Sequence, residues 1–415
     1  MSKKTMLFDA TIIAQAYDSS TSVRSGIYFT AYNLLKQFIA SNKFDIYVYS
    51  KWSCFNGLQK FAQDELPNHI FVISDLKYGE RIFQIQQHCR LLRQQKKNIQ
   101  RLFYSVYKKI LSLFRNNFPA TDIAFSPALV FPSNVKSANK YTVLYDTIPL
   151  LVSDYFKDKN MGWYSDLIKS LNNKDKYFAI SQSAKDDFIK YIPQLSNEQI
   201  TVTHLAASDN FYLVTDKQKI SQVRQKYNIP TDKRYIFSLC TLEPRKNLIR
   251  AVKTFITFIK KNKIDDLVFV LGGGHWEEFI GKIEQEISDL GKYKDKIIRA
   301  GYVADEDLSP LYSGAEWFVY TSQYEGFGLP PLEAMQCGCP VITSNNSSLP
   351  EVVGDAGIMI DYNSDEQHIK AYEDYYFDED KRKNFSLKGL ERAKQFSWQK
   401  CANHMIDVIG SFNKK

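Results

Sequence analysis

The 415-residue sequence is informative first for what it lacks. It contains no apolar run near the roughly 18 to 20 residues that a membrane-spanning helix needs. Its first residues, MSKKTMLFDATII, do not have the shape of a secretory signal peptide. Its six cysteines are few and scattered, so they fit reduced thiols better than a disulfide framework. These absences argue against membrane-spanning and secreted proteins, and we expect a cytoplasmic protein.

Three signals of metal or cofactor chemistry are also missing. Cys337 and Cys339 are too close together to chelate one metal and no second pair follows, so we interpret them as packed free thiols. Residues 305–307 (Asp-Glu-Asp) fit a surface loop better than an Asp-x-Asp metal site. Glycines 272–274 lack the spacing of a dinucleotide fingerprint, which argues against a nicotinamide enzyme.

What the sequence does have is a net charge of +8 that is unevenly distributed. Residues 1–200 carry a net charge of +10, whereas residues 201–415 carry −2. The first half is therefore suited to meet an anionic partner. The excess is concentrated in residues 77–115, which contain ten Lys or Arg and one acid, Glu80.

Within this basic segment, residues 99–114 place bulky apolar side chains at the i, i+3, i+4 spacing of an amphipathic helix. Two interpretations stay open. The helix packs its apolar stripe on a domain core, or it lies on an anionic membrane surface, where each nearby Lys or Arg contributes about 1 kcal/mol. We expect no nucleic-acid partner, because no known nucleic-acid-reading motif accompanies the charge.

Apolar, β-branched runs alternate with amphipathic helical patterns almost throughout the chain. This alternation predicts parallel sheets made of right-handed crossover units, and two sets of about six strands predict two doubly wound α/β domains facing a central ligand cleft. A polar stretch at 206–216 predicts the boundary between domains 1–208 and 209–397. The predicted strands are 6–9, 44–50, 69–73, 141–145, 177–180 and 200–202, then 235–239, 267–271, 297–300, 317–320, 340–343 and 358–360; helices are predicted over 27–40, 247–262 and 276–290.

The densest chemical signal is EGFGLPPLE at residues 325–333, between a predicted strand and a predicted helix over 331–336. Its glycines permit close backbone approach, its prolines suit a helix's first turn, and the free N–H groups of that turn form an anion site. Glu325 falls on the loop and Glu333 inside the helix, so both can point into one cleft. The alternative is a helix-start loop with two solvated acids.

A second signal, TLEPRKN at residues 241–247, also follows a predicted strand. Pro244 presets a helix start, which places Arg245 and Lys246 in its first turn. Cations usually avoid that end because of the helix macrodipole, unless they bind an anion such as phosphate. The alternative is a pair of exposed cations. Gly26, between the first strand and the helix over 27–40, is a weaker phosphate-loop candidate.

Together these residues resemble retaining glycosyltransferase family 4. The resemblance is specific over residues 299–361 (RAGYVADEDLSPLYSGAEWFVYTSQYEGFGLPPLEAMQCGCPVITSNNSSLPEVVGDAGIMID) with TLEPRKN upstream, and extends more weakly through SGIYFTAYNLL, AFSPALVFP, VLYDTIPLL and ISQSAKDDF. It implies the GT-B fold, in which two Rossmann-like domains flank a nucleotide-sugar cleft and the first domain binds the acceptor. The ending FSWQKCANHMIDVI resembles the family's last helix, which crosses back, so residues 398–415 should complete the first domain.

The resemblance also implies roles for the residues of these motifs. Glu333 should hold the ribose hydroxyls of the donor, and Glu325 should hydrogen-bond the donor sugar near the reacting carbon. Lys246, helped by Arg245, should neutralise the diphosphate leaving group. The remaining implied contacts are Phe327, Gly328 and Leu329 as backbone donors to the sugar and diphosphate, Gly26 as the close approach of the first domain, and Tyr302 and Val303 beside the base.

Two positions depart from the family's pattern. The family often has His-Asp after a strand of the first domain, and this sequence has Tyr145-Asp146; both stay site candidates because Tyr can also donate a hydrogen bond. Some relatives place an Arg six residues before the phosphate-motif Lys, where this sequence has Cys240. Either Arg245 carries the missing charge or donor binding is weaker.

The resemblance implies a metal-independent, retaining hexosyltransferase with no cofactor. LEPRKN with DTIPL is most similar to mannosyl- and rhamnosyl-transferring relatives, so GDP-mannose is the first choice of donor, with UDP- and dTDP-sugars open. The acceptor would be a lipid-linked or growing glycan of bacterial surface polysaccharide or lipopolysaccharide synthesis. The enzyme would act in the cytoplasm, at the inner face of the plasma membrane if residues 77–115 bind that membrane. The alternative is a non-catalytic relative that binds a glycan or a partner enzyme.

Overall fold

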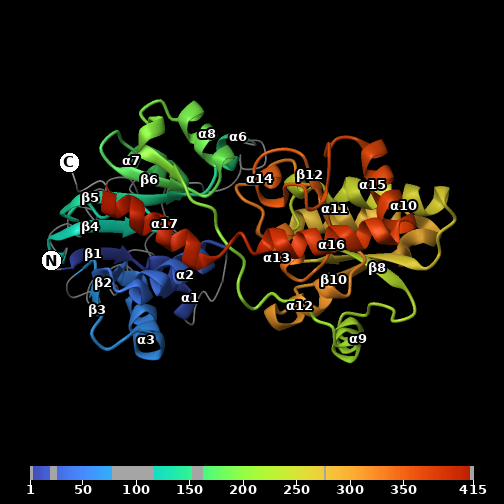
Figure 1. The fold of residues 1–415 in the computed structure, drawn as a ribbon, viewed down its shortest axis with the longest axis horizontal. Coiled ribbons are helices and arrows are strands. Elements are labelled where there is room, and N and C mark those ends of the chain that lie inside the picture. The colour runs from blue at the N-terminus through green and yellow to red at the C-terminus, as the bar shows by residue number, and fades with distance from the viewer. Residues whose placement is uncertain (1–2, 19–25, 77–115, 152–161, 275–276, 412–415) are drawn as a thin grey trace, which may run out of the picture.

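The computed structural model describes residues 3–18, 26–76, 116–151, 162–274 and 277–411. Two lobes lie side by side along the long axis of the molecule, and each is built on one parallel sheet with helices packed on it (Figure 1). Buried apolar residues of the strands and of the facing helix stripes form the cores. The predicted class of two doubly wound α/β domains is therefore confirmed.

The first sheet has seven strands in the order β3-β2-β1-β4-β5-β6-β7. All neighbouring pairs described are parallel. Its strands are β1 (Lys4–Asp9), β2 (Phe44–Ser50), β3 (Phe71–Ser74), β4 (Thr121–Ser126), β5 (Ser137–Leu144), β6 (Lys176–Ala179) and β7 (Ile200–Val202).

The second sheet has six parallel strands in the order β10-β9-β8-β11-β12-β13. Counted within the lobe this order is 3-2-1-4-5-6, the order of doubly wound dinucleotide-binding folds. Its strands are β8 (Arg234–Leu239), β9 (Leu267–Gly272), β10 (Ile297–Gly301), β11 (Phe318–Tyr320), β12 (Val341–Ser344) and β13 (Ile358–Ile360).

The helices cover the faces of the sheets. In the first lobe they are α1 (Thr11–Tyr17), α2 (Gly26–Ser41), α3 (Phe55–Glu65), α6 (Ile148–Leu151), α7 (Gly162–Ser170) and α8 (Gln182–Tyr191). From the second lobe onward they are α9 (Lys217–Lys226), α10 (Leu248–Lys261), α11 (Glu277–Ser288), α12 (Asp305–Ser313), α13 (Leu329–Gln336), α14 (Leu349–Val353), α15 (Asp365–Phe377), α16 (Glu379–Ala393) and α17 (Trp398–Ser411).

Two elements of the first lobe differ from the sequence prediction. The strand β4, which pairs with β1 and β5, was not predicted, because the apolar run in TDIAFS is only three residues long and has polar residues on both sides. The helix α1 was also missed, and it lies between β1 and α2 where a single loop was expected. The basic residues 77–115 lie outside the described residues.

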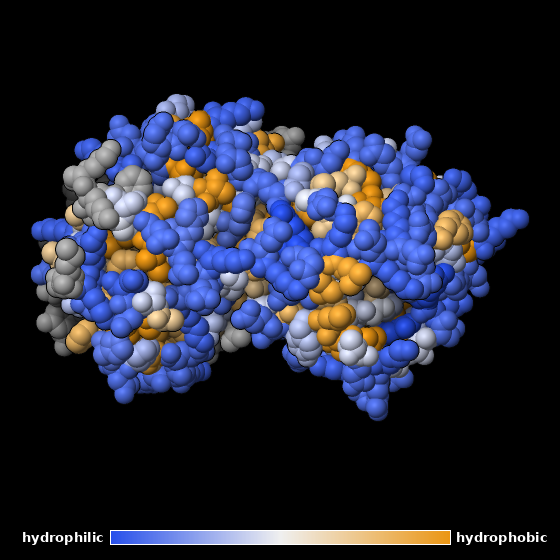
Figure 2. Space-filling model, viewed as in Figure 1, coloured by the Kyte–Doolittle hydropathy of each residue, from blue (hydrophilic) through white to orange (hydrophobic). Residues whose placement is uncertain are grey.

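The chain crosses between the lobes twice. The first crossing runs from the end of β7 to the start of α9. The second lies between α16 and α17, and α17 packs against α2 of the first lobe, with Met405 and Ile409 buried (Figure 1). Hydrophilic side chains cover much of this junction on the face drawn in Figure 2.

No helix among the described residues is both long and apolar enough to cross a bilayer.

Candidate active site

The motifs singled out in the sequence follow strands next to the point where the strand order reverses. In the second sheet the order reverses between β8 and β11, and residues 241–247 follow β8 while residues 321–328 follow β11. Doubly wound sheets bind ligands in the crevice beyond the carboxyl ends of the strands at such a reversal. The topology therefore brings TLEPRKN and EGFGLP to one edge of the second lobe.

The backbone of TLEPRKN differs from the prediction. Residues Pro244–Lys246 form a short 3-10 turn rather than the first turn of the helix, because Asn247 adopts a left-handed conformation (φ 58°) and α10 begins only at Leu248. The break removes Arg245 and Lys246 from the helix N-terminus, where the macrodipole disfavours cations. Both side chains are buried and reach the loop after β11.

The loop after β11 is fixed by two serines that precede α14. The Glu325 N–H donates to Ser347 Oγ (3.0 Å), and the buried Ser348 hydroxyl donates to the carbonyls of Glu325 (3.0 Å) and Phe327 (2.6 Å). Gly328 then begins α13 at φ 116°, a conformation that a residue with a Cβ rarely adopts. These serines were not identified as site residues from the sequence.

A compact charge cluster sits at the centre of this edge. Glu325 Oε1 lies 2.7 Å from Lys246 Nζ and 3.0 Å from an Arg245 guanidinium nitrogen, and all three side chains are buried. Lys246 Nζ also donates to the Tyr320 hydroxyl (2.7 Å), and Arg245 pairs with Glu243. The structure thus joins Glu325, Lys246 and Arg245, three of the predicted site residues, through one carboxylate.

The cluster holds Glu325 in its charged form. Burial alone would raise the pKa of Glu325, but the charges of Arg245 and Lys246 outweigh it and lower that pKa to about 2. Burial alone would lower the pKa of Arg245, but the carboxylates of Glu325 and Glu243 raise it above its ordinary value. The buried Glu325 carboxylate and the buried Arg245 guanidinium are therefore both charged at neutral pH, with Lys246 Nζ beside them.

The first lobe meets this cluster through Asp146, just beyond β5. A Cβ on Gly326 would lie 3.0 Å from Asp146 Cβ and 3.0 Å from the Tyr145 carbonyl oxygen, so only glycine fits this approach without displacement. The Gly326 carbonyl accepts a hydrogen bond from the buried Ser181 hydroxyl (2.7 Å). Burial raises the pKa of Asp146, whereas the Ile148 N–H and the charge of Arg245 oppose the rise.

Tyr145 and Gly26 occupy different places at the junction. Tyr145 is the first residue after β5, not its last, and its buried hydroxyl lies near Thr30 of α2 and Cys401 of α17. No hydrogen bond between described residues connects that hydroxyl with the Glu325 cluster, although the Tyr145 carbonyl lies beside Gly326. A Cβ on Gly26 would lie 3.6 Å from Leu329 Cδ1, which places the start of α2 beside the 325–329 loop.

Glu333 forms a separate polar site on α13. Its Oε2 accepts a hydrogen bond from the Tyr312 hydroxyl (3.1 Å), and burial, with a smaller effect from Asp305, raises its pKa to about 7. Val303 is buried, whereas the Tyr302 side chain is 71% exposed. These two residues, which were predicted to lie beside the base of the donor, come just before α12, the helix that carries both Asp305 and Tyr312.

The acidic triplet at 305–307 lies in a helix rather than a loop, and Asp305 and Glu306 are exposed as predicted whereas Asp307 is not. It forms the first turn of α12, and Asp307 is buried, where its Oδ2 accepts from Lys226 Nζ (2.6 Å) and the Tyr227 hydroxyl (2.7 Å). These bonds give Asp307 a structural role in holding α9 against α12. The described residues contain no group of three or more His, Cys, Asp or Glu side chains arranged to hold a metal ion.

A second contact between the lobes was not identified from the sequence. The Glu351 carboxylate of α14 accepts from the N–H groups of Gln182 and Ser183 at the start of α8 (2.7 Å each) and lies 3.2 Å from His204 Nε2. Burial alone would raise the pKa of Glu351, but the hydrogen bonds lower it. Only tertiary structure brings these residues together, since Glu351 lies more than 140 residues from each partner.

Comparison with known proteins gives the family context of this geometry. Residues 219–392 match the family of glycosyl transferases group 1. The chain is 33% identical to O-antigen chain mannosyltransferase B of Escherichia coli over 288 residues, 69% of this chain and 73% of that protein. It is 30% identical to the serotype-specific mannosyltransferase WbdA of Escherichia coli over 267 residues, 64% of this chain but only 32% of WbdA.

Solved structures resemble nearly the whole chain. Anabaena HepE in complex with UDP-glucose superposes with a TM-score of 0.68 at 14% identity, over 98% of this chain and 100% of HepE. WaaG, a glycosyltransferase involved in lipopolysaccharide biosynthesis, gives a TM-score of 0.63 at 12% identity, over 97% of this chain and 99% of WaaG. At these identities the likeness concerns the fold, and it confirms the predicted GT-B arrangement of two Rossmann-like domains.

The raised pKa of Glu333 predicts a pH-dependent stability. Because the folded-state pKa of about 7 exceeds the ordinary value of 4.5, the native state holds this proton more tightly than the unfolded chain. Stability should therefore fall as the pH rises from 4.5 towards 7. Urea unfolding of Glu333→Gln should show a smaller loss than the wild type across this range, and equal slopes would contradict the prediction.

The close packing at Gly326 predicts that alanine destabilises the protein there but not at an open glycine position. Gly326→Ala should lower the free energy of unfolding by about 1 to 3 kcal/mol, because the new methyl group meets Asp146 and the Tyr145 carbonyl. Gly281→Ala is the matched control, since a Cβ there meets nothing within 4 Å and alanine favours the helix α11. Denaturant titration of both variants tests this, and equal stabilities would show that the junction accommodates the methyl group.

Proposed function

The chain belongs to the glycosyl transferases group 1 family, and from this premise we propose that it transfers mannose from GDP-mannose to a lipid-linked or growing glycan of a bacterial surface polysaccharide. The two Escherichia coli mannosyltransferases support mannose as the transferred sugar, and the name of the first supports an O-antigen-like product. UDP- and dTDP-sugars are the alternative donors.

The observation that carries the proposal is the Glu325 cluster at the strand-order reversal. Breaking the bond between a sugar and its diphosphate develops positive charge on the sugar ring and negative charge on the leaving group. The cluster supplies a buried, ionised carboxylate that lies within 3.0 Å of two buried basic groups, Lys246 Nζ and a guanidinium nitrogen of Arg245. Fixed charges of this kind stabilise a transition state without reorganising during the reaction.

Lys246 is the residue that we assign to the diphosphate. An ammonium group has three N–H donors, and the described structure directs two of them to Tyr320 and Glu325. The third is available to a phosphate oxygen. The backbone N–H groups at the start of α13, at Gly328 and Leu329, offer further donors, with Phe327 just before them, and Gly26 brings the first lobe's backbone close.

Arg245 and Glu325 have different roles in the proposed reaction. The Arg245 guanidinium is held by Glu243 and by the Tyr324 carbonyl, so it contributes fixed charge rather than a mobile contact. Glu325 would turn from its two cations towards the hydroxyls of the donor sugar once the diphosphate takes a share of their charge. Asp146 lies against the same loop and would face the sugar from the first lobe.

Glu333 is assigned to the ribose of the nucleotide. Its carboxyl group can accept hydrogen bonds when ionised and can donate one when protonated. With a pKa raised to about 7 it is poised between these forms at neutral pH. Tyr302 and Val303, just before α12, would flank the base, Tyr302 through its exposed ring.

The acceptor and its location form a further part of the proposal. The first lobe binds the acceptor, and the +10 charge of residues 1–200 suits an acceptor presented at an anionic membrane surface. The protein would act in the cytoplasm at the inner face of the membrane, with residues 77–115 as the contact. We further propose that the reaction retains the anomeric configuration and requires no metal ion or other cofactor.

One observation favours the alternative of a non-catalytic glycan- or partner-binding relative. Tyr145 replaces the His that the family often has, and its hydroxyl lies towards Thr30 and Cys401 rather than in the Glu325 cluster. Release of GDP from GDP-mannose by the purified protein would exclude this alternative. If the protein binds a nucleotide but releases none from any nucleotide sugar, the result would favour the non-catalytic alternative.

Removal of the cluster charges should abolish most of the activity. Lys246→Ala and Glu325→Gln should each reduce turnover by about 10²- to 10³-fold, the usual loss when one preorganised stabilising group is removed. Lys383→Ala and Glu379→Gln are matched controls, because these residues form an exposed ion pair on α16 and should leave turnover within about twofold. Full activity of either cluster variant, with its fold intact by circular dichroism, would contradict the proposal.

The donor assignment predicts which nucleotide stabilises the protein. A ligand that binds only the folded state raises stability by about 2.7 kcal/mol at a hundredfold excess over its Kd. GDP should therefore raise the melting temperature more than UDP or dTDP at equal concentration. A larger shift with UDP or dTDP would reassign the donor, and Glu333→Gln should reduce the shift with the preferred nucleotide.

A further inference from the structure

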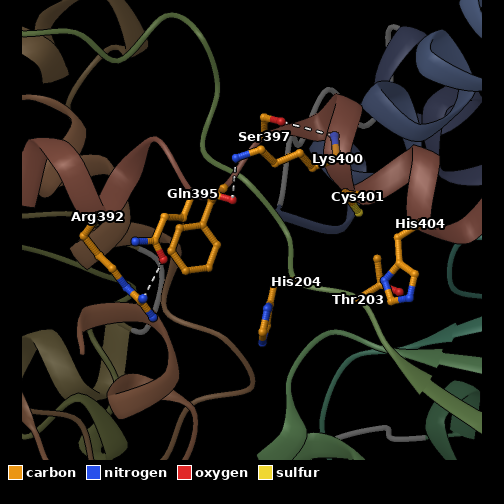
Figure 3. Close-up of a pocket in the computed structure, with 9 residues that line it drawn as sticks. Thr203, His204, Arg392, Gln395, Ser397, Lys400, Cys401 and His404 are labelled. Atoms are coloured by element: carbon orange, nitrogen blue, oxygen red, sulfur yellow. Dashed lines mark hydrogen bonds between the residues drawn. The ribbon is translucent and has the colours of Figure 1, made fainter.

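Helix α8 of the first lobe is fixed to the second lobe by its first turn. The N–H groups of Gln182 and Ser183, its first two residues, donate to the Glu351 carboxylate (2.7 Å each). Near the end of α16, Arg392 donates to the Glu351 carbonyl (2.6 Å), and it lines the same cavity of about 420 Å³ as His204 of the first crossing (Figure 3). The start of α8 is therefore held at a defined place against α14.

The second turn of α8 meets the second lobe at one tyrosine. Ser183 and Asp187 are four residues apart, so they lie on one side of the helix. The Tyr324 hydroxyl donates to Asp187 Oδ2 and lies 3.2 Å from Ser183 Oγ. Burial and the hydrogen bond to Asp187 raise the pKa of Tyr324, so its hydroxyl is a donor at neutral pH. A hydroxyl that donates to a carboxylate makes one of the stronger hydrogen bonds in proteins, and this one crosses between the lobes.

The main chain of Tyr324 belongs to the charge cluster. Its carbonyl accepts from Arg245, whose guanidinium lies 3.0 Å from Glu325 Oε1. On the other side of Glu325, the Gly326 carbonyl accepts from the Ser181 hydroxyl of the first lobe (2.7 Å). The residues before and after Glu325 are therefore both bonded to the first lobe, while the Glu325 side chain is bonded to the cations of the second.

The bond from Asp187 is added to contacts that lie within the second lobe. Ser347 and Ser348 hold the main chain of Glu325 from α14 and the turn before it. Reacting groups must be held to within about 0.5 Å of their productive position, and a misplacement of about 1 Å can lower a rate about 100-fold. The docking of α8 thus contributes to the final position of the carboxylate.

We propose that Asp187 is a positioning residue, which fixes Tyr324 from the first lobe and thereby sets the position of Glu325. The part of this inference that concerns sugar transfer rests on the proposed function. Asp187 acts through Tyr324 and not on the donor, so the charged site reaches its working geometry when α8 is docked on the second lobe.

Hydrogen-exchange mass spectrometry of the full chain tests the proposal without requiring transferase activity. Asp187→Ala should raise the exchange rate of residues 321–329 about threefold or more, although the substitution lies in the other lobe. Residues 234–239 of the buried strand β8 should exchange as in the wild type, which shows that the fold is intact. Asp186→Ala is the matched control, because Asp186 is exposed and bonds within α8 to Gln182 (2.6 Å). It should leave exchange of residues 321–329 unchanged.

Steady-state kinetics separates positioning from a merely structural role. Asp187→Ala and Tyr324→Phe should each lower kcat about tenfold and leave KM for the donor within about twofold, because Lys246 and the start of α13 still bind the diphosphate. The double variant should lose no more than the larger single loss, since both changes break one hydrogen bond. Asp187→Asn should recover part of the lost kcat, because its amide oxygen can still accept from Tyr324.

Unchanged exchange of residues 321–329 in Asp187→Ala would overturn the proposal. So would losses that multiply in the double variant, or a loss confined to KM. If the wild-type protein turns over no nucleotide sugar, the proposed function fails, and raised exchange of residues 321–329 would still show that Asp187 fixes the loop of Glu325.

Discussion

The buried carboxylate of Glu325, shared by Lys246 and Arg245, is the interaction on which the candidate site depends. Each of these charges alone would be costly to bury, and together they remain ionised because each lowers the cost of the others. Two features of the backbone bring these three charged side chains together. Asn247 breaks the chain away from α10 so that both cations reach the carboxylate, and Ser347 and Ser348 hold the loop that carries Glu325.

The same loop also joins the two lobes. Gly326 lies directly after Glu325 and packs against Asp146, and its carbonyl accepts from Ser181 of the first lobe. Glu351 adds a contact to the start of α8. A change in the separation of the lobes would therefore act on the loop that positions Glu325, which is how a two-lobed transferase can connect closure over its donor with the assembly of its charged site.

Much of this arrangement could be predicted from the sequence. Alternating apolar and amphipathic patterns located six of the seven strands in the first sheet and all six in the second, because a strand buried in a parallel sheet leaves a continuous apolar run. EGFGLPPLE and TLEPRKN carried enough local signal to place Glu325 and Lys246 after neighbouring strands. The short strand β4 was missed because its apolar run, IAF, is only three residues long.

The features that escaped prediction depend on tertiary structure. No local pattern shows that Glu351 will meet Gln182, that Asp307 will be buried beside Tyr227, or that the Tyr145 hydroxyl will face α2 and α17. Asn247, whose left-handed conformation separates Arg245 and Lys246 from α10, was not predicted either, because the sequence pattern does not show whether the chain forms a turn or a helix there.

The most direct test of the central claim is a crystal structure of the protein with GDP-mannose bound. The account predicts a diphosphate oxygen within hydrogen-bond distance of Lys246 Nζ, with the Glu325 carboxylate facing the hexose. A diphosphate held elsewhere, with Glu325 still paired to both cations and away from the sugar, would contradict it.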